Sequence, residues 1–205
     1  MQNKTQLVLS HFKTSDPILF AAAQKFELQP LQRSDDLFES LSESIISQQL
    51  SVKVSDVLFA RFKKLFPKEK ISAKQLSLLP DETIRTHGIS WAKIRALKDL
   101  ARHVNENLLE LHRIDDLSNE NVTAELVRVK GIGPWTAEMF LMFSLAREDI
   151  FSTRDLGLKR AIQKIYGLTK EPDEKKLLSL SKKWSPYRTY ACRILWKTLD
   201  NNPLQ

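Results

Sequence analysis

A ten-residue string at residues 129–138, Val-Lys-Gly-Ile-Gly-Pro-Trp-Thr-Ala-Glu, constrains this chain more than any other feature, because two glycines and a proline interrupt a helical pattern there. Ahead of the string, Val122, Leu126 and Val129 recur at the spacing of one buried helix face, and Ser118 is placed as the N-cap. The pattern predicts a helix that ends where the glycines begin.

The two glycines, Gly131 and Gly133, stand two residues apart, and the lack of a side chain at both positions allows unusual backbone angles. Pro134 suits the first turn of a helix, where its missing N–H would have no partner. The apolar face then continues through Met139, Phe140, Met142, Phe143 and Leu145. We therefore expect a helix, a Gly-x-Gly hairpin and a second helix.

A hairpin of this kind leaves the N–H groups in the first turn of the second helix available. Together with the helix dipole, these groups form a site for a phosphate. The string therefore predicts a clamp on the DNA backbone that holds any base sequence. From these residues alone, the alternative is an ordinary connection between two core helices.

Asp155 stands twenty residues after Trp135, and this arrangement resembles the helix-hairpin-helix and Gly/Pro-rich loop plus Asp signature of the DNA base-excision glycosylase superfamily. Within it, the chain is most similar to the 3-methyladenine DNA glycosylases of the bacterial inducible and yeast type. Residues 44–51, Ser-Ile-Ile-Ser-Gln-Gln-Leu-Ser, resemble the entry to that family's central domain, and residues 184–191, Trp-Ser-Pro-Tyr-Arg-Thr-Tyr-Ala, resemble its last helix. The likeness runs from about residue 37 to about residue 197.

The expected fold class is all-α, since no stretch alternates apolar and polar residues as strands do. Apolar helical faces occur at Leu37, Leu41 and Ile45, at Val54, Leu58, Phe62 and Leu65, at Ile94, Leu97, Ala101 and Val104, and at Leu158, Ile162 and Ile165, closed by Gly167. The resemblance implies two helical lobes with the active cleft between them. Residues 37–147 would form the central lobe with the hairpin, and residues 1–36 plus 148–205 the second lobe.

Asp155 precedes an amphipathic helix in a short polar connection, so the residues alone favour an N-cap role for it. The resemblance implies that Asp155 is the catalytic carboxylate. The two roles are compatible, because a carboxylate at a helix start is fixed in place and kept ionised by the dipole. Hydrolysis of an N-glycosidic bond builds positive charge on the sugar, which a fixed anion stabilises.

Trp135 occupies the position where members of the superfamily that also cut the backbone carry a lysine, whose amine forms a Schiff base. We therefore expect base release without strand cleavage. The resemblance places Trp135 and Trp196 in the substrate pocket, where an aromatic face would attract a positively charged alkylated purine. A core role is the alternative for both tryptophans. Two further pocket aromatics of the family fall on Met139 and Leu156, a departure that bears on substrate breadth.

The resemblance also implies the DNA contacts. The hairpin would bind the phosphate backbone through Gly131, Gly133 and Thr136. Gln49 would be the wedge that fills the gap left by the flipped base, with Gln48 as its neighbour in the minor groove or in the structure. From the residues alone, the alternative is a helix connection with buried amides. By family likeness only, the main-chain carbonyls of Val127, Val129 and Ile132 would hold a Na⁺ or K⁺ ion, and no cofactor is required.

The formal net charge of +7 suits a polyanionic partner, and residues 148–205, with 12 basic and 7 acidic residues, contain most of the excess. A phosphate track or a merely solvated surface would account for Lys159, Arg160, Lys164, Lys182, Lys183, Arg188 and Arg193. Cys192 is the only cysteine, which excludes the four-cysteine iron–sulfur cluster of the endonuclease III-like branch. No metal site is indicated by the four scattered histidines, and each is expected at the surface. They are His11, His87, His103 and His112.

No apolar run is long enough for a signal peptide or a bilayer span, so we expect a soluble intracellular protein of the cytoplasm and nucleoid or of the nucleus. Its expected partner is damaged double-stranded DNA, which it would bind as a monomer and away from membranes. Two alternatives to an alkylation-repair glycosylase remain. One is a helix-hairpin-helix protein that binds DNA without catalysis, and the other is an oxidised-base glycosylase with lyase activity.

Overall fold

The computed structural model describes residues 4–200, with the side chain of residue 200 left aside, and within that range the chain is helical without a strand, which confirms the predicted fold class. Residues 1–3 and 201–205, which the expected second lobe includes, lie outside the described residues. The elements are α1 (Lys4–Ser15), α2 (Pro17–Ala23), α3 (Leu37–Ser47), α4 (Val52–Lys63), η1 (Pro67–Glu69), α5 (Ala73–Leu78), α6 (Asp81–Thr86), α7 (Trp91–Asn105), η2 (Leu111–Asp116), α8 (Asn119–Leu126), α9 (Pro134–Phe143), α10 (Leu156–Ile165), α11 (Glu174–Lys182) and α12 (Arg188–Asp200).

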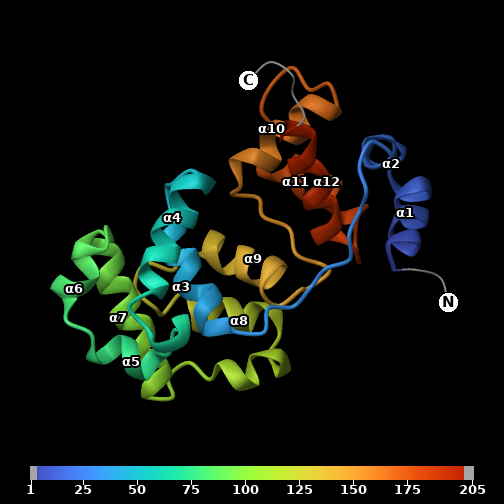
Figure 1. The fold of residues 1–205 in the computed structure, drawn as a ribbon. Helices are drawn as coiled ribbons and strands as arrows, with labels where there is room; N and C mark the ends of the chain where they lie inside the picture. The colour runs from blue at the N-terminus through green and yellow to red at the C-terminus, as the bar shows by residue number, and fades with distance from the viewer. Residues whose placement is uncertain (1–3, 201–205) are drawn as a thin grey trace. The chain divides into compact units, whose positions relative to one another are not determined.

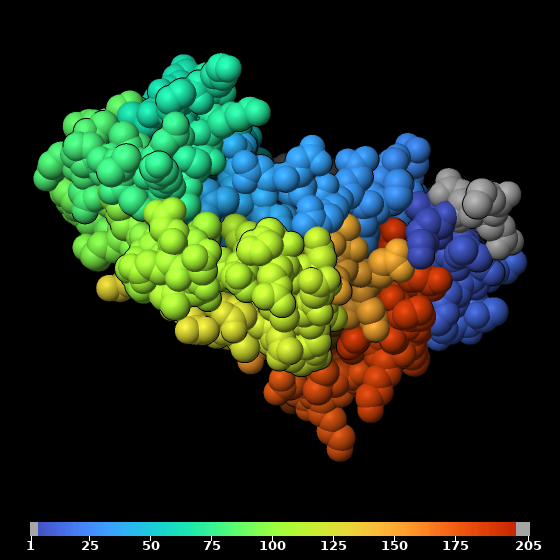
Figure 2. Space-filling view, turned by 90° about the horizontal axis from the view of Figure 1, so that it is seen from below, coloured from blue at the N-terminus to red at the C-terminus, as the bar shows by residue number. Residues whose placement is uncertain are grey.

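The chain divides into two compact units. The central unit is continuous in sequence, from residue 33 to residue 145, and the second unit combines the two ends of the chain, residues 1–32 and 146–205. In Figures 1 and 2 the dark blue of α1 and α2 lies beside the red of α12, in agreement with the packing of α2 against α12. The sequence predicted boundaries between residues 36 and 37 and between residues 147 and 148. Both lie within a few residues of the boundaries between the two compact units.

The central unit is built around α3 and α7, against which α4, α5, α6 and α9 pack, and its helices form one continuous mass in Figure 2. Ser90 begins α7 as its N-cap, and the predicted face of that helix is confirmed, since Ile94, Leu97 and Ala101 are fully buried. The fourth predicted member, Val104, is only half-buried. This helix thereby presents a fixed surface on which the hairpin rests.

The face predicted for α4 was wrong in part. Phe62 is fully buried as predicted, but Val54 is 46% exposed, and the helix turns Phe59 into the core beside Phe62. The sequence of α4 contains two overlapping apolar stripes, and the stripe with two phenylalanines removes more apolar area from water than the stripe with Val54 and Leu58. The Phe62 ring also packs edge-on against Phe66, with centroids 5.2 Å apart.

In the second unit, a buried carboxylate ties the two chain ends together. Asp16 is 2% exposed, and its Oδ1 caps α2 by accepting a hydrogen bond from the Leu19 N–H at 3.2 Å. Its Oδ2 accepts from the Tyr166 hydroxyl at 2.5 Å and from the Trp184 indole N–H at 2.9 Å. Burial and the neighbouring Asp16 both raise the pKa of Tyr166, so the phenol stays protonated as a donor. A buried carboxylate is tolerated here because its hydrogen bonds are satisfied.

Candidate functional site

The hairpin, residues 127–133, joins α8 to α9 as the sequence predicted. Ser118 caps α8 by accepting from the Asn121 N–H at 3.2 Å, and the helix ends at Leu126. Gly131 has a φ of +84°, the left-handed conformation that favours glycine. Of the two glycines that allow unusual backbone angles, only Gly131 adopts them, because the φ of −98° and ψ of 174° at Gly133 are open to any residue.

Gly131 also lies against α7 at a distance that no larger residue permits. A β-carbon at this position would lie 2.8 Å from the β-carbon of Ala96, whereas a β-carbon at Gly133 would meet no heavy atom within 4 Å. The two glycines therefore have different reasons to be present. Gly131 is required by the fold of the hairpin, and Gly133 leaves space open at the start of α9.

Asp99 of α7 anchors the hairpin by accepting a hydrogen bond from the Lys130 N–H at 2.8 Å. Arg102 donates to the same carboxylate at 2.9 Å. Burial by itself would raise the pKa of Asp99, but these hydrogen bonds to the ionised form outweigh it and lower the pKa below its ordinary value. An ionised Asp99 thus fixes the main chain directly before Gly131.

His103, on the same helix, corrects the expectation that each histidine lies at the surface. It is 5% exposed, and its Nδ1 lies 2.8 Å from the main-chain oxygen of Asp99. A histidine can be buried in this way because the preceding turn of its own helix supplies a partner for the ring nitrogen.

The first turn of α9 has the features of an anion site. Gly133 is the N-cap and has no side chain to accept from the N–H groups of the turn, and Pro134 follows at the first helical position. Helix N-termini of this kind bind phosphate through those N–H groups and the dipole. Thr136, one of the expected DNA-contacting residues, is buried, so its side chain serves the hairpin rather than the surface.

The turn at residues 48–50 is fastened to the hairpin. The Gln48 side-chain amide donates to the Gly131 carbonyl at 2.9 Å and to the Thr136 hydroxyl at 3.4 Å. Lys93 of α7 donates to the Ile46 carbonyl at 2.7 Å, at the end of α3. Gln49 stands between these fixed points with a φ of +58° and an exposed side chain. The strained backbone presents Gln49 outward, which suits the wedge role expected of it.

Trp135 and Met139 lie four residues apart on α9, on the same side of the helix. Trp135 is 42% exposed, which disfavours the alternative of a core residue. Met139 lines a hollow of about 320 Å³ together with Phe143 from the same helix and Glu43 from α3. Burial raises the pKa of Glu43, and the carboxylates of Glu39 and Asp56 add to the shift.

Asp155 is the N-cap of α10, as its local sequence indicated. Its Oδ1 accepts from the Leu158 N–H at 2.7 Å, and the same oxygen accepts from the Trp196 indole N–H at 3.0 Å. The residue is only 8% exposed. Two donors therefore hold the carboxylate of this buried aspartate, and Trp196, half-buried in α12, contacts it directly. Leu156, the next residue, is 59% exposed.

The structure adds Gly157, which sequence reasoning missed. A β-carbon there would lie 3.0 Å from Asp155 Oδ1 and 3.1 Å from Cδ1 of Trp196. A signal was present in the sequence, because a glycine inside the first turn of a helix costs about 1 kcal/mol relative to alanine and therefore indicates a close approach.

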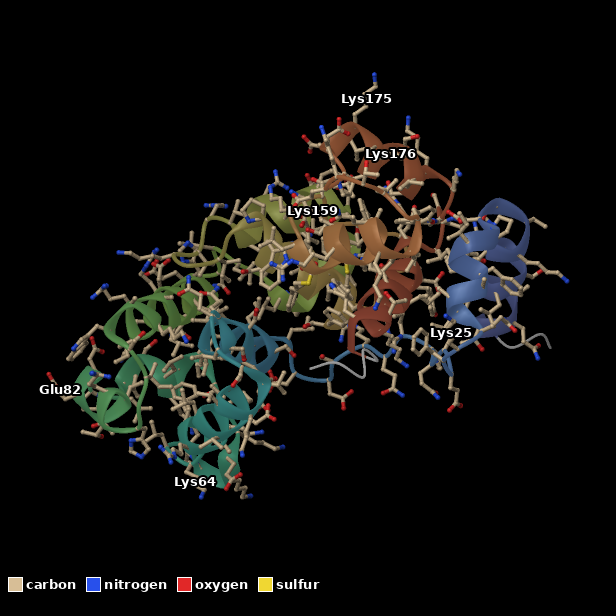
Figure 3. The ribbon with its side chains drawn as sticks, turned by 90° about the horizontal axis from the view of Figure 1, so that it is seen from above. Lys25, Lys64, Glu82, Lys159, Lys175 and Lys176 are labelled. Atoms are coloured by element: carbon tan, nitrogen blue, oxygen red, sulfur yellow. The ribbon has the colours of Figure 1, made fainter. Side chains whose placement is uncertain are left out.

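The basic residues expected to form a phosphate track are largely engaged within the second unit. Lys159 pairs with Glu171 at 3.2 Å, Lys164 donates to the Thr198 carbonyl at 2.8 Å, and Arg193 donates to the Gln29 carbonyl at 2.9 Å. Arg188 pairs with Asp149 at 2.6 Å. In Figure 3, Lys175 extends outward from α11 and away from the other labelled side chains. The track stays a prediction, and the exposed lysines of α11 are additional candidates for it.

The structure thus brings the expected residues into two groups. Gln48, Gly131 and Thr136 meet in the central unit, with Gln49 and Trp135 adjacent to them in sequence. Asp155 and Trp196 meet in the second unit, beside Gly157. No helix within residues 4–200 is long and apolar enough to cross a membrane.

Comparison with known proteins identifies the relatives of this arrangement. Residues 43–186 match the model of the family described as HhH-GPD superfamily base excision DNA repair protein. Over 167 aligned residues, the chain is 34% identical to DNA-3-methyladenine glycosylase 1 of Schizosaccharomyces pombe, with 78% of this chain and 72% of that protein covered.

Two solved structures have the same fold. The crystal structure of a DNA-3-methyladenine glycosidase from Bacillus halodurans superposes with a TM-score of 0.83 and 34% identity, covering 95% of this chain and 89% of that one. The 3-methyladenine DNA glycosylase of S. pombe in complex with abasic DNA gives a TM-score of 0.83 and 30% identity, covering 97% of both chains. These findings confirm the family predicted from the three sequence motifs.

Proposed function

Because this chain belongs to the HhH-GPD superfamily of base excision DNA repair proteins, in its 3-methyladenine DNA glycosylase branch, we propose that it hydrolyses the N-glycosidic bond of alkylated purines in duplex DNA. The observation that supports this most directly is the carboxylate of Asp155, buried and held by two donors at the start of α10. A protein that only binds DNA has no need of such a carboxylate. The product is an abasic site in an intact strand.

Asp155 is the catalytic residue in this proposal. As the bond between base and deoxyribose breaks, positive charge develops on the sugar, and the fixed carboxylate stabilises it electrostatically. The same group orients or deprotonates the water that attacks the anomeric carbon. Its place at the N-terminus of α10 suits an anion, since the helix dipole attracts negative charge there.

Trp135 selects the base. N3-methyladenine and related alkylated purines carry a positive charge, and the electron-rich face of an indole attracts a cation by roughly 0.5 to 2 kcal/mol. These bases are also good leaving groups and need little acid assistance. Met139 and Leu156 stand where the family has further aromatic residues, and the loss of these stacking surfaces favours the alkylated purines that already leave readily.

The reaction is hydrolysis without lyase chemistry. A lyase needs an amine that attacks the sugar and forms a Schiff base, and Trp135 stands where bifunctional relatives supply that amine. The oxidised-base alternative is disfavoured for the same reason. An iron–sulfur cluster has no place in this proposal either, because the sequence contains a single cysteine, Cys192, and the structure buries it.

The DNA is gripped by its backbone and opened by the 48–50 turn. The N-terminus of α9 holds a phosphate with Gly131, Gly133 and Thr136 shaping the hairpin, and Gln49 enters the stack where the damaged base has left it. Flipping costs a few kcal/mol, and an intercalated side chain offsets part of it. One monomer suffices, since each proposed contact comes from a single chain.

A monovalent cation, Na⁺ or K⁺, is the one non-protein group in the proposal. The hairpin offers the carbonyl oxygens of Val127, Val129 and Ile132, and neutral carbonyl ligands suit such an ion. Val127 is the C-cap of α8, and the Val129 carbonyl accepts one hydrogen bond, from the Ile132 N–H at 3.1 Å, with a second lone pair remaining. The ion would connect the hairpin to a DNA phosphate. Otherwise no cofactor is required.

The decisive experiment compares the protein with its Asp155→Asn variant on methylated genomic DNA and identifies the bases released. Asparagine keeps the shape and the capping oxygen, so the variant should fold with an unchanged melting temperature. Release of 3-methyladenine in single turnovers should fall at least tenfold, equivalent to roughly 1.4 kcal/mol of transition-state stabilisation. A variant that releases the base at the parental rate would remove Asp155 from the mechanism.

A further inference from the structure

One side of the last helix, α12, contacts Arg147, Ile150 and Asp155 in the connection that leads to α10. Thr189, Cys192 and Trp196 recur at spacings of three and four residues, so they share one face of the helix. Thr189 Oγ1 donates to the Arg147 carbonyl at 2.5 Å and accepts from the Ile150 N–H at 3.1 Å. Cys192 Sγ donates to the Ile150 carbonyl at 3.7 Å. Trp196 completes the row at the carboxylate itself.

Along this face, Thr189 and Cys192 are fully buried and bind only main-chain atoms of the connection that leads to Asp155. Their role is therefore to fix the path of the backbone. Trp196 differs from them, because its indole N–H binds the side-chain oxygen on which the proposed chemistry depends. A hydrogen bond to an ionised group is about twice as strong as one between neutral groups, and it sets the direction of the carboxylate as well.

Gly157 makes this contact possible. A β-carbon at residue 157 would lie 3.0 Å from Asp155 Oδ1, 3.1 Å from Cδ1 and 3.2 Å from Nε1 of Trp196. All three atoms belong to the hydrogen-bonded pair, so an alanine would press on both members at once. Gly157 has an ordinary helical place in α10 rather than a left-handed backbone, which leaves space as the reason for glycine.

We propose that Trp196 and Gly157 are positioning residues for the reaction, which hold the Asp155 carboxylate in its working orientation, the first through its indole N–H and the second by leaving room for it. This inference rests on the proposed catalytic role of Asp155. It assigns to Trp196 a function in addition to the substrate contact that the family resemblance implies, and it gives a function to Gly157, for which the sequence implied none.

The test is a double-mutant cycle between Trp196→Phe and Asp155→Asn, with single-turnover release of 3-methyladenine as the readout. Phenylalanine keeps an aromatic ring and removes the N–H. We expect Trp196→Phe to slow excision roughly tenfold in the parent, as the loss of a hydrogen bond to a charged group predicts, and less than about twofold in the Asp155→Asn background. Affinity for a duplex with an abasic site should stay within about twofold, because phosphate contacts dominate binding.

Trp184→Phe is the matched control, since Trp184 also donates its indole N–H to an aspartate, Asp16 Oδ2 at 2.9 Å. That pair joins the chain ends, so the control should lower the melting temperature and leave the excision rate unchanged. Trp196→Phe should instead slow excision and leave the melting temperature unchanged. Gly157→Ala is the second variant, and it should slow excision at unchanged abasic-site affinity, again only while Asp155 is present.

The outcomes separate the inference from the function it rests on. If Asp155→Asn abolishes excision and Trp196→Phe does not slow it, the inference is wrong and the proposed function stands. If Trp196→Phe slows both backgrounds equally, Trp196 acts on the substrate independently of the carboxylate, and the inference is again wrong. If Asp155→Asn retains the parental rate, both fail together. Should Trp196→Phe not fold, the same cycle with Gly157→Ala decides the matter.

Discussion

The side-chain amide of Gln48 donates a hydrogen bond to the main-chain carbonyl of Gly131 at 2.9 Å, and so joins a turn to a hairpin that lies 83 residues further along the chain. The two elements proposed to touch DNA in the central unit are thus one rigid piece. Gln49, directly after Gln48, is exposed and in a left-handed conformation.

This pair of neighbours yields the first prediction. Gln48→Ala should weaken binding to damaged and undamaged duplexes alike by about fivefold, because the lost hydrogen bond is worth roughly 1 kcal/mol and loosens the hairpin. Gln49→Ala should leave affinity for undamaged duplex intact and slow excision of the lesion, since it removes only the wedge. Fluorescence anisotropy with both duplexes and single-turnover kinetics measure the two effects. Identical behaviour of the two variants would contradict this division of roles.

The two hairpin glycines yield the second prediction. Gly131→Ala places a β-carbon 2.8 Å from Ala96 in a left-handed conformation, so the free energy of unfolding should fall by roughly 1 to 3 kcal/mol. Gly133→Ala has an allowed backbone and open space, and its melting temperature should match that of the parent. Its added methyl group should nevertheless weaken duplex binding by obstructing the phosphate. A Gly133→Ala variant with parental affinity would move the clamp away from this helix start.

Acid sensitivity of the hairpin anchor is the third prediction. The pKa of Asp99 is lowered in the folded protein, so its stabilising contribution is complete above the unfolded value of about 3.9 and is lost as the pH falls through the folded value. Asp99→Asn retains an oxygen for the Lys130 N–H without the charge. The variant should therefore be less stable than the parent at pH 7, and the difference should be smaller at pH 3.

Urea unfolding at both pH values measures this. Burial would raise the pKa of Asp149, but hydrogen bonds from Arg188 and Ser185 lower it, and because the parent and the variant share this group, it cancels in the comparison. A stability difference that persists undiminished at acid pH would show that the Asp99 charge contributes nothing.

The fourth prediction concerns strand cleavage. With no lysine at position 135, lesion-containing duplex should yield intact strands that break only after hot alkali, and borohydride should trap no covalent adduct. Lys130 is the nearest lysine in sequence, and it lies within the hairpin, where its backbone N–H is held by Asp99 of α7. A stoichiometric adduct that disappears on mutation of one lysine would transfer this protein to the bifunctional class.

Structural features that depend only on residues close together in the sequence were predicted correctly. Ser118 and Asp155 act as N-caps, Gly131 has the left-handed backbone, and Gly167 closes α10 with a φ of +61°. Each of these follows from residues within one or two turns, where spacing and side-chain chemistry decide the structure. The family motifs added the expected roles of residues that local patterns cannot assign.

Features that depend on distant partners were missed. Asp99 meets Lys130 across 31 positions and Trp196 meets Asp155 across 41, and no local pattern encodes such pairs. His103 was expected at the surface, yet packing leaves it only 5% exposed. The spacing of the two glycines did not show that only Gly131 adopts a left-handed backbone, nor that Gly133 is set apart by the open space around it.

The second unit is built from both ends of the chain, and this determines the order in which the two units can fold during synthesis. Residues 33–145 emerge as a self-contained unit and can fold while synthesis continues, since domains generally fold as they appear. The buried face of α2, by contrast, must wait for α10 and α12 to be translated before it finds these partners. A nascent chain therefore acquires its proposed grip on DNA early and its hydrolytic centre last, when Trp196 reaches Asp155.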